Sequence, residues 1–259
     1  MRLALHAEWT KIRTVASTLW LLLGTIAATV ALSAGVTSVL TCGTVGCGGN
    51  DTTKLSLTGV ELGQALVAVL AAGVISGEYS SGMICTTLAA MPRRATVLAA
   101  KAVILTGIVA AAGTIAVLGS LLAGRLILPS RGFTAARGYP ALSLANGPTL
   151  RAAAGSVLYL ALIALLSLGV ATAVRDSATS IGVVLGLLYL VPVISQAIGN
   201  PHWQRLLRQI GPVSAGLAIQ ATIDLRGLPI SPWPGLGVLA AWATAALLAG
   251  GVLLHMRDA

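Results

Sequence analysis

Charged residues are scarce in this sequence, and their scarcity excludes most soluble folds. Only 9% of the 259 residues are charged, whereas 56% are hydrophobic, and the mean hydropathy is +0.92. A soluble surface for a chain of this length requires many more charges. The sequence therefore predicts an integral membrane protein.

Motifs for catalysis, metals and nucleotides are also absent. The chain contains no G-x-x-x-x-G-K-[ST] phosphate loop, so we expect no ATP site of its own. The histidines, His6, His202 and His255, are far apart and form no His-Glu-x-x-His motif or comparable metal set. No serine nucleophile motif lies beside a histidine. We expect no enzyme, no cofactor and no metal site, and any energy must come from a partner.

A dense basic run is absent as well, although the formal net charge is +9. The sixteen Lys and Arg residues are scattered through loops at the ends of apolar runs, with little aromatic interleaving. This pattern argues against nucleic-acid binding and favours contacts with membrane lipids and a role in topology. With one Phe, four Tyr and five Trp, the chain outlines no aromatic cavity, and the sequence indicates no substrate.

Long apolar runs are what the sequence has in abundance. At 1.5 Å per residue, about 20 apolar residues cross a hydrocarbon core about 30 Å thick. We therefore expect an all-α membrane protein, with one transmembrane domain over residues 1–259 and a kink at Pro192, which removes a backbone hydrogen bond. The predicted spans are residues 19–40, 59–76, 97–123, 152–174, 179–198 and 235–254.

The segments outside these spans carry their own signals. Leu5, Trp9 and Ile12 are spaced four and three residues apart, on one stripe of a helix, and Lys11 lies off that stripe. The pattern predicts an amphipathic helix in the membrane interface, or simply a basic leader that sets orientation. Residues 123–151 contain GR, PSRGF, ARGYP and NGP and predict a long hydrophilic loop.

Two cysteines and one glutamate are candidate site residues. Cys42 and Cys47 have no further Cys or His nearby to complete a zinc set. They predict a disulfide if their loop faces an oxidising compartment, and two inert thiols otherwise. Glu61 lies at the edge of the second span, one helical turn from Gln64. Because dehydrating a carboxylate is costly, Glu61 is a candidate for the substrate path, although it can also simply reach the headgroups.

Three glycine pairs match the small-residue spacing that lets helices approach closely. With thirty glycines in the chain, such matches are weak signals of a helix contact. The pairs are Gly59 with Gly63, Gly73 with Gly77, and Gly182 with Gly186.

Residues 77–101, GEYSSGMICTTLAAMPRRATVLAAK, interrupt the apolar runs with charge, small polar residues and one proline. We expect a short polar loop that meets water between the second and third spans. The Glu-Tyr-Ser-Ser-Gly that ends the second span, the Thr-Thr-Leu, the Pro-Arg-Arg and the Lys of the third span resemble the permease subunits of bacterial type-2 ABC exporters. The candidate residues of this loop are Glu78, Tyr79, Ser80, Ser81, Gly82, Pro92, Arg93, Arg94 and Lys101.

This resemblance implies a role for each part of the chain. Residues 77–101 would be the coupling loop that contacts a separate ABC ATPase subunit, and the N-terminal amphipathic helix would be the elbow helix beside it. Residues 211–223, too short to cross, would dip into the membrane before the last span, with a surface helix as the alternative. The resemblance also implies the cell membrane, cytosolic termini and a permease homodimer or heterodimer. A loop that only fixes topology is the simpler alternative for residues 77–101.

Other functions and the orientation stay open at this level. An ion- or proton-coupled carrier would use Glu61 or Glu78 as its relay, and a membrane anchor or assembly protein would transport nothing. Six spans place both termini on one side, and the sixteen basic residues divide into eight and eight between the two sides. The positive-inside rule therefore gives no orientation.

Overall fold

The computed structural model describes residues 6, 8–11, 16–41, 50–80, 82–83, 94–137, 139 and 142–256. These residues form helices joined by turns, and no strand occurs among them. Within these ranges, six helical segments are long and apolar enough to cross a membrane. The protein is therefore an all-α, multi-pass membrane protein, as the sequence predicts.

Each predicted span coincides with a helical segment of the structure, to within five residues at either end. Long apolar runs fold this way because a helix satisfies its own backbone polar groups in lipid. The segments are α2 (Ala16–Val39), α4 (Val60–Ser80), α6 (Arg94–Ile127), α7 (Gly147–Val174), the fifth span, and α12 (Pro232–Met256). The fifth span is made of α8 (Ser177–Leu185), the π-helical turn η3 (Gly186–Leu190) and α9 (Val191–Ala197).

The fifth span is interrupted before its proline. The π-helical turn ends directly before α9, in which Pro192 is the second residue. A π turn accommodates a local break in the hydrogen-bond ladder, which a proline also imposes. The structure thus places an irregularity next to Pro192, and the kink itself stays a prediction.

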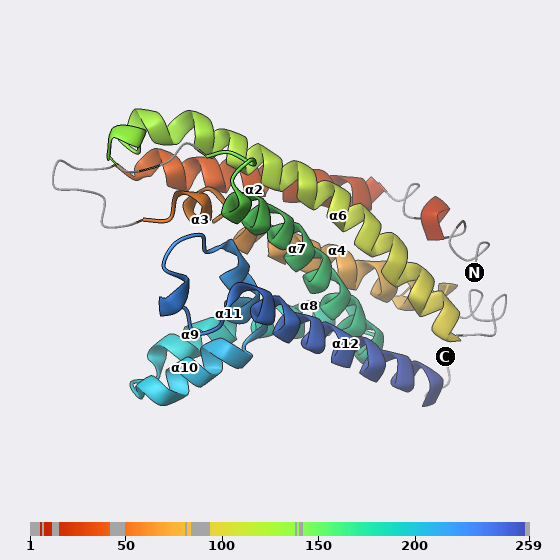
Figure 1. The fold of residues 1–259 in the computed structure, drawn as a ribbon. Helices are drawn as coiled ribbons and strands as arrows, with labels where there is room; N and C mark the ends of the chain where they lie inside the picture. Colours follow the sequence, from red (N-terminus) through yellow and green to blue (C-terminus); the bar gives the residue numbers. More distant parts are fainter. Residues whose placement is uncertain are drawn as a thin grey trace.

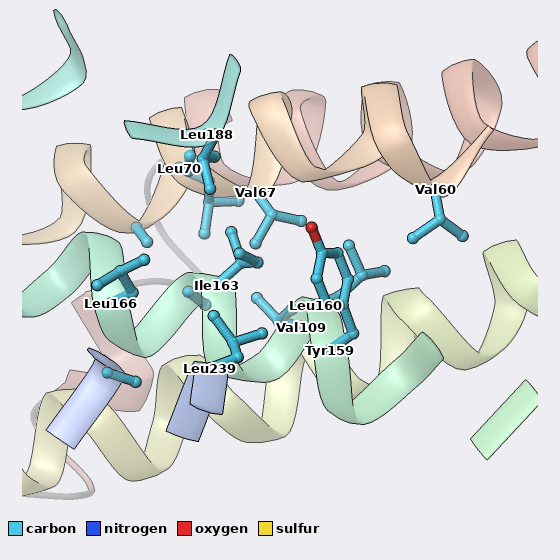
Figure 2. Close-up of a cluster of buried hydrophobic side chains, with 14 of the residues drawn as sticks. Val60, Val67, Leu70, Val109, Tyr159, Leu160, Ile163, Leu166, Leu188 and Leu239 are labelled. Carbon is cyan, nitrogen blue, oxygen red and sulfur yellow. The ribbon is translucent and has the colours of Figure 1, made fainter. Parts of the chain in front are cut away.

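Helix α7 is the centre of the bundle (Figure 1). It contacts α4, α6, α8 and α12. In its apolar 18-residue stretch 61% of the residues are buried, against 17% in the corresponding stretches of α2 and of the fifth span. Figure 2 shows Ile163 and Leu166 of α7 beside Leu70 of α4, and the hydroxyl of Tyr159 directed towards α4. Among the six spans, α2 and the fifth span therefore leave the largest share of their surface for lipid or for another helix.

Glycines set the distance between two helix pairs. A Cβ on Gly169 of α7 would lie 2.5 Å from the backbone of α12. A Cβ on Gly59 or Gly63 would lie 1.9 or 2.2 Å from atoms of Thr29 on α2. The spacing therefore marks a true contact at Gly59 and Gly63. A Cβ on Gly73 would meet no described atom within 4 Å, so the same spacing marks no such contact there.

The two ends of the bundle differ, and we name them by their residues. The charged end carries residues 8–11, the end of α4, the start of α6 and the end of α12, whereas the distal end carries the long connections (Figure 1). The distal connections contain α3 (Thr52–Ser56), η1 (Leu128–Arg131), η2 (Ala135–Arg137), α10 (Pro201–Ile210), α11 (Pro212–Gly216), η4 (Leu217–Gln220) and η5 (Leu225–Gly227).

The segment before the last span is inserted into the bundle. A Cβ on Gly216 of α11 would lie 2.7 Å from the ring of Tyr159, twelve residues inside α7. Both α11 and η4 are largely buried against α7 and α12. A surface helix is therefore wrong for residues 212–220, while α10 remains exposed on the outside. The distal loop predicted at residues 123–151 is also shorter, because α6 continues to Ile127 and α7 begins at Gly147.

Candidate functional site

The polar segment between the second and third spans is more helical than the sequence suggests. Helix α4 continues through Glu78, Tyr79 and Ser80, and α6 begins at Arg94, so Lys101 lies two turns inside a helix. The predicted loop at residues 77–101 is therefore wrong in its bounds. Its charged ends stay helical because their charges are paired inside the protein and have no need to reach water.

Four charged side chains meet at the charged end and form what we call the charge cluster: Glu8, Lys11, Glu78 and Lys101. The ammonium group of Lys101 donates to the carboxylate of Glu8 at 2.7 Å and to that of Glu78 at 2.8 Å. The ammonium group of Lys11 donates to Glu78 at 2.7 Å and to Glu8 at 3.3 Å. Each ammonium group thus bridges the same two carboxylates, and the formal charge of the four groups is zero.

Three of these four side chains are buried. The exposed fractions are 1% for Lys101, 3% for Glu8 and 6% for Glu78, against 32% for Lys11. Buried charges persist only when they are paired and hydrogen-bonded. The prediction that this part of the chain meets water is consequently wrong for Glu78 and Lys101.

Lys11 closes the cluster from its solvent side. Burial alone would lower its pKa, but the hydrogen bond and the charge of Glu78, with those of Glu8, outweigh burial and raise the pKa. Lys11 thus stays charged across the physiological pH range. The N-terminal helical residues 8–11 are thereby attached to both α4 and α6.

Glu8 is the residue of this site that the sequence did not single out. It precedes Lys11 by three residues, at helical pairing distance, which was the available signal. A second signal is that Glu78 and Lys101 stand at the ends of two spans, where buried charges require partners. The spacing of residues in the sequence does not reveal the contact of Glu8 with Lys101, because the two residues are 93 positions apart.

A cavity of 390 Å³ opens beside the charge cluster, between α2 and α4. Leu21, Leu70 and Val74 form apolar walls, and Ser17 and Thr18 add hydroxyl groups. The cluster lies at the polar end of this cavity, since its four residues also line it. A change in the shape or contents of the cavity would therefore alter the surroundings of the paired charges.

Two arginines fasten the end of α12 to the same region. The guanidinium of Arg94 donates to the carbonyl of Leu254 at 2.6 Å. Arg94, which the sequence predicts in a loop, therefore links α6 to α12. Arg175 donates to the carbonyl of Leu253 at 3.4 Å, and its guanidinium lies 5.4 Å from the ring centroid of Tyr79. Both arginines neutralise the partial negative charge at the helix C-terminus.

The short turn between α7 and α8 carries a helix cap. Asp176 accepts a hydrogen bond from the backbone N–H of Thr179 at 2.7 Å, and this bond lowers the pKa of the exposed carboxylate. The neighbouring Arg175 has a left-handed backbone, with a φ of 66°. Asp176 is therefore the N-cap of α8.

The other predicted site residues divide into three groups. Trp9, Ser80 and Gly82 are exposed at the charged end. Glu61 is exposed near the start of α4, and its backbone carbonyl accepts a hydrogen bond from Tyr189 at 2.6 Å. Seven residues lie outside the described part of the chain: Leu5, Ile12, Cys42, Cys47, Ser81, Pro92 and Arg93.

Three residues after Glu61, the side-chain carbonyl of Gln64 accepts a hydrogen bond from the hydroxyl of Tyr159. Both side chains are buried between α4 and α7. Gln64 therefore serves packing, and the substrate-path role of Glu61 stays a prediction.

Within the described ranges no group of three His, Cys, Asp or Glu side chains is arranged to hold a metal ion. The site itself is electrostatic, because its paired charges join residues 8–11 to two spans. Comparison of the chain with protein-family models and with curated proteins gave no match.

Proposed function

We propose that this protein is the membrane-spanning permease subunit of an ATP-binding cassette exporter. It would lie in the cell membrane with both termini in the cytosol, and a separate ATPase subunit would bind its charged end. The observation that carries the proposal is the charge cluster, because it joins residues 8–11 to α4 and α6 on either side of the predicted coupling segment.

The cluster supports coupling for a mechanical reason. A force on a segment reaches the spans only if the segment is fixed to them at more than one point. Here Lys101 is hydrogen-bonded to both Glu78 and Glu8, and Arg94 is hydrogen-bonded to the end of α12. A push on this end would therefore move α4, α6 and α12 together.

The burial pattern supports a second permease subunit. Only 17% of the apolar window is buried in α2 and in the fifth span. The large side chains of Trp20 and Val193 are 72% and 61% exposed. A homologous or identical subunit would cover part of this surface, and lipid would cover the rest.

The test is affinity purification of the tagged protein from native membranes in mild detergent, with its companions identified by mass spectrometry. We expect a stoichiometric ATPase subunit. Arg93→Glu should reduce its recovery, because the substitution reverses a charge in the predicted coupling segment. Arg131→Glu, the same change at the distal end, should not. A protein that elutes alone, or an equal effect of both variants, would refute the proposal.

A further inference from the structure

A second cavity lies at the distal end of the bundle, far from the charge cluster. Its volume is 320 Å³, and it lies between α6 and the residues that lead into α7. On the other side it is bounded by Leu142, Ser143, Leu144, Ala145 and Thr149. The wall on α6 is one stripe at helical spacing, made of Leu118, Leu121, Leu122 and Arg125.

The cavity has a positive group without a partner. Arg125 is exposed, and its guanidinium has no ion pair or hydrogen bond with any described residue. Across the cavity, Thr149 lies in the first turn of α7, where Asn146 makes no capping side-chain bond. The partial positive charge of that helix end adds to the charge of Arg125. The mouth of the cavity therefore suits an anion.

The rest of the cavity suits a hydrocarbon chain. Leu118 and Leu122 are 44% and 58% exposed on α6, a helix apolar enough to cross a membrane. Below Arg125 they continue the stripe towards the middle of the span. A small inorganic anion would leave these leucines uncovered, whereas an amphiphile with a charged head and an apolar chain would cover them.

The depth of Arg125 matches a lipid headgroup. Lys101 of the charge cluster and Arg125 lie on the same continuous helix, 24 residues apart. At 1.5 Å per residue this separation is about 36 Å, slightly more than the roughly 30 Å of a hydrocarbon core. With Lys101 at one boundary of the hydrocarbon core, this separation would place Arg125 among the phosphate groups of the leaflet at the distal end.

We propose that this cavity is a binding site for one phospholipid of that leaflet. Its phosphate group contacts Arg125 and the first turn of α7, and one acyl chain lies along Leu118 and Leu122. An anionic lipid binds more tightly than a zwitterionic one, because no headgroup ammonium offsets the attraction to Arg125. The site does not depend on the proposed exporter function or on the orientation of the chain.

The test is native mass spectrometry of the purified protein in detergent, titrated with phosphatidylglycerol. We expect one tightly held lipid per chain, and about a tenfold weaker affinity for Arg125→Gln, since one charge-assisted hydrogen bond is lost. Arg131→Gln is the matched control, because Arg131 is also exposed at this end but does not line the cavity. It should bind like the wild type.

A second variant separates the cavity from the charge. Ala145→Phe leaves Arg125 in place and fills the cavity from an exposed position, so it should also weaken the binding of the lipid. Inorganic phosphate at millimolar concentration should not displace the lipid. The proposal is overturned if Arg125→Gln binds normally, if Arg131→Gln loses as much lipid, if Ala145→Phe has no effect, or if phosphate competes.

Discussion

Removal of Lys101 from the charge cluster tests the energetics of the site directly. In Lys101→Met the side chain keeps its length but loses its charge, and Glu8 and Glu78 are left with Lys11 alone. At an effective dielectric constant of about 20, a unit charge 2.8 Å from another gains roughly 6 kcal/mol. Lys101 makes two contacts of this length, at 2.7 and 2.8 Å. Desolvation of the ions offsets much of this attraction.

The net loss is expected to be smaller than the Coulomb attraction but still large. Breaking a buried ion pair by removing one partner costs about 3 to 5 kcal/mol. At about 2 to 4 °C for each kcal/mol, the midpoint of thermal unfolding should fall by about 6 to 20 °C. The measurement is tryptophan fluorescence of the purified protein during heating. Lys54→Met is the control, because Lys54 is exposed and the change should move the midpoint by no more than about 2 °C.

A second substitution distinguishes charge from packing. In Lys101→Met/Glu78→Gln the remaining Glu8 and Lys11 are again neutral as a pair, so the double variant should melt higher than the sum of the single effects predicts. The interaction free energy between the two substitutions should be about 0.5 to 3 kcal/mol. If Lys101→Met melts like the wild type, or if the two substitutions simply add, then the cluster does not hold these elements together.

Three further predictions follow from other contacts. Gly169→Val should lower the unfolding midpoint, because its Cβ would lie 2.5 Å from the backbone of α12, whereas Gly237→Val, where no described atom lies within 4 Å, should not. The raised pKa of Lys11 adds stability that is fully present below its unfolded pKa of about 10.4 and is lost as pH rises through the folded pKa, so an alkaline drop in midpoint should be smaller in Lys11→Met. Asp51→Ala should speed hydrogen exchange at Thr222 and Ile223, because both amides donate to that carboxylate, and unchanged exchange would contradict this tie.

The spans could be predicted because a long apolar run has one stable form in lipid. The start and end of each helix depend on less visible terms. Residues 78–80 and 94–101 contain charges that normally mark a loop, yet they remain helical because Glu78 and Lys101 neutralise one another. The two charges stand at the ends of two spans, which suggests that each needs a partner, but the sequence does not show that they pair with one another across 23 residues.

The glycine pairs make the same point about packing. Gly59 and Gly73 carry the same spacing motif, but only Gly59 lies against another helix. The difference is in the neighbour, since Thr29 of α2 approaches the first and no described atom approaches the second. Likewise Glu8 could be recognised as half of a local pair with Lys11, but not as a partner of Lys101, which lies 93 residues away.

The charge cluster also has a consequence for the order of synthesis. Glu8 leaves the ribosome before Glu78, and Glu78 before Lys101, so both carboxylates exist when the lysine arrives. An uncompensated lysine in the middle of a span costs roughly 2.5 to 3.5 kcal/mol to insert, and less near the end of a span. Glu8 and Glu78, which are synthesised first, offset this cost by pairing with the lysine. When the third span inserts, its lysine therefore pairs with a carboxylate from the start of the chain. Substitutions near residue 8 should then impair the insertion or packing of the span that carries Lys101.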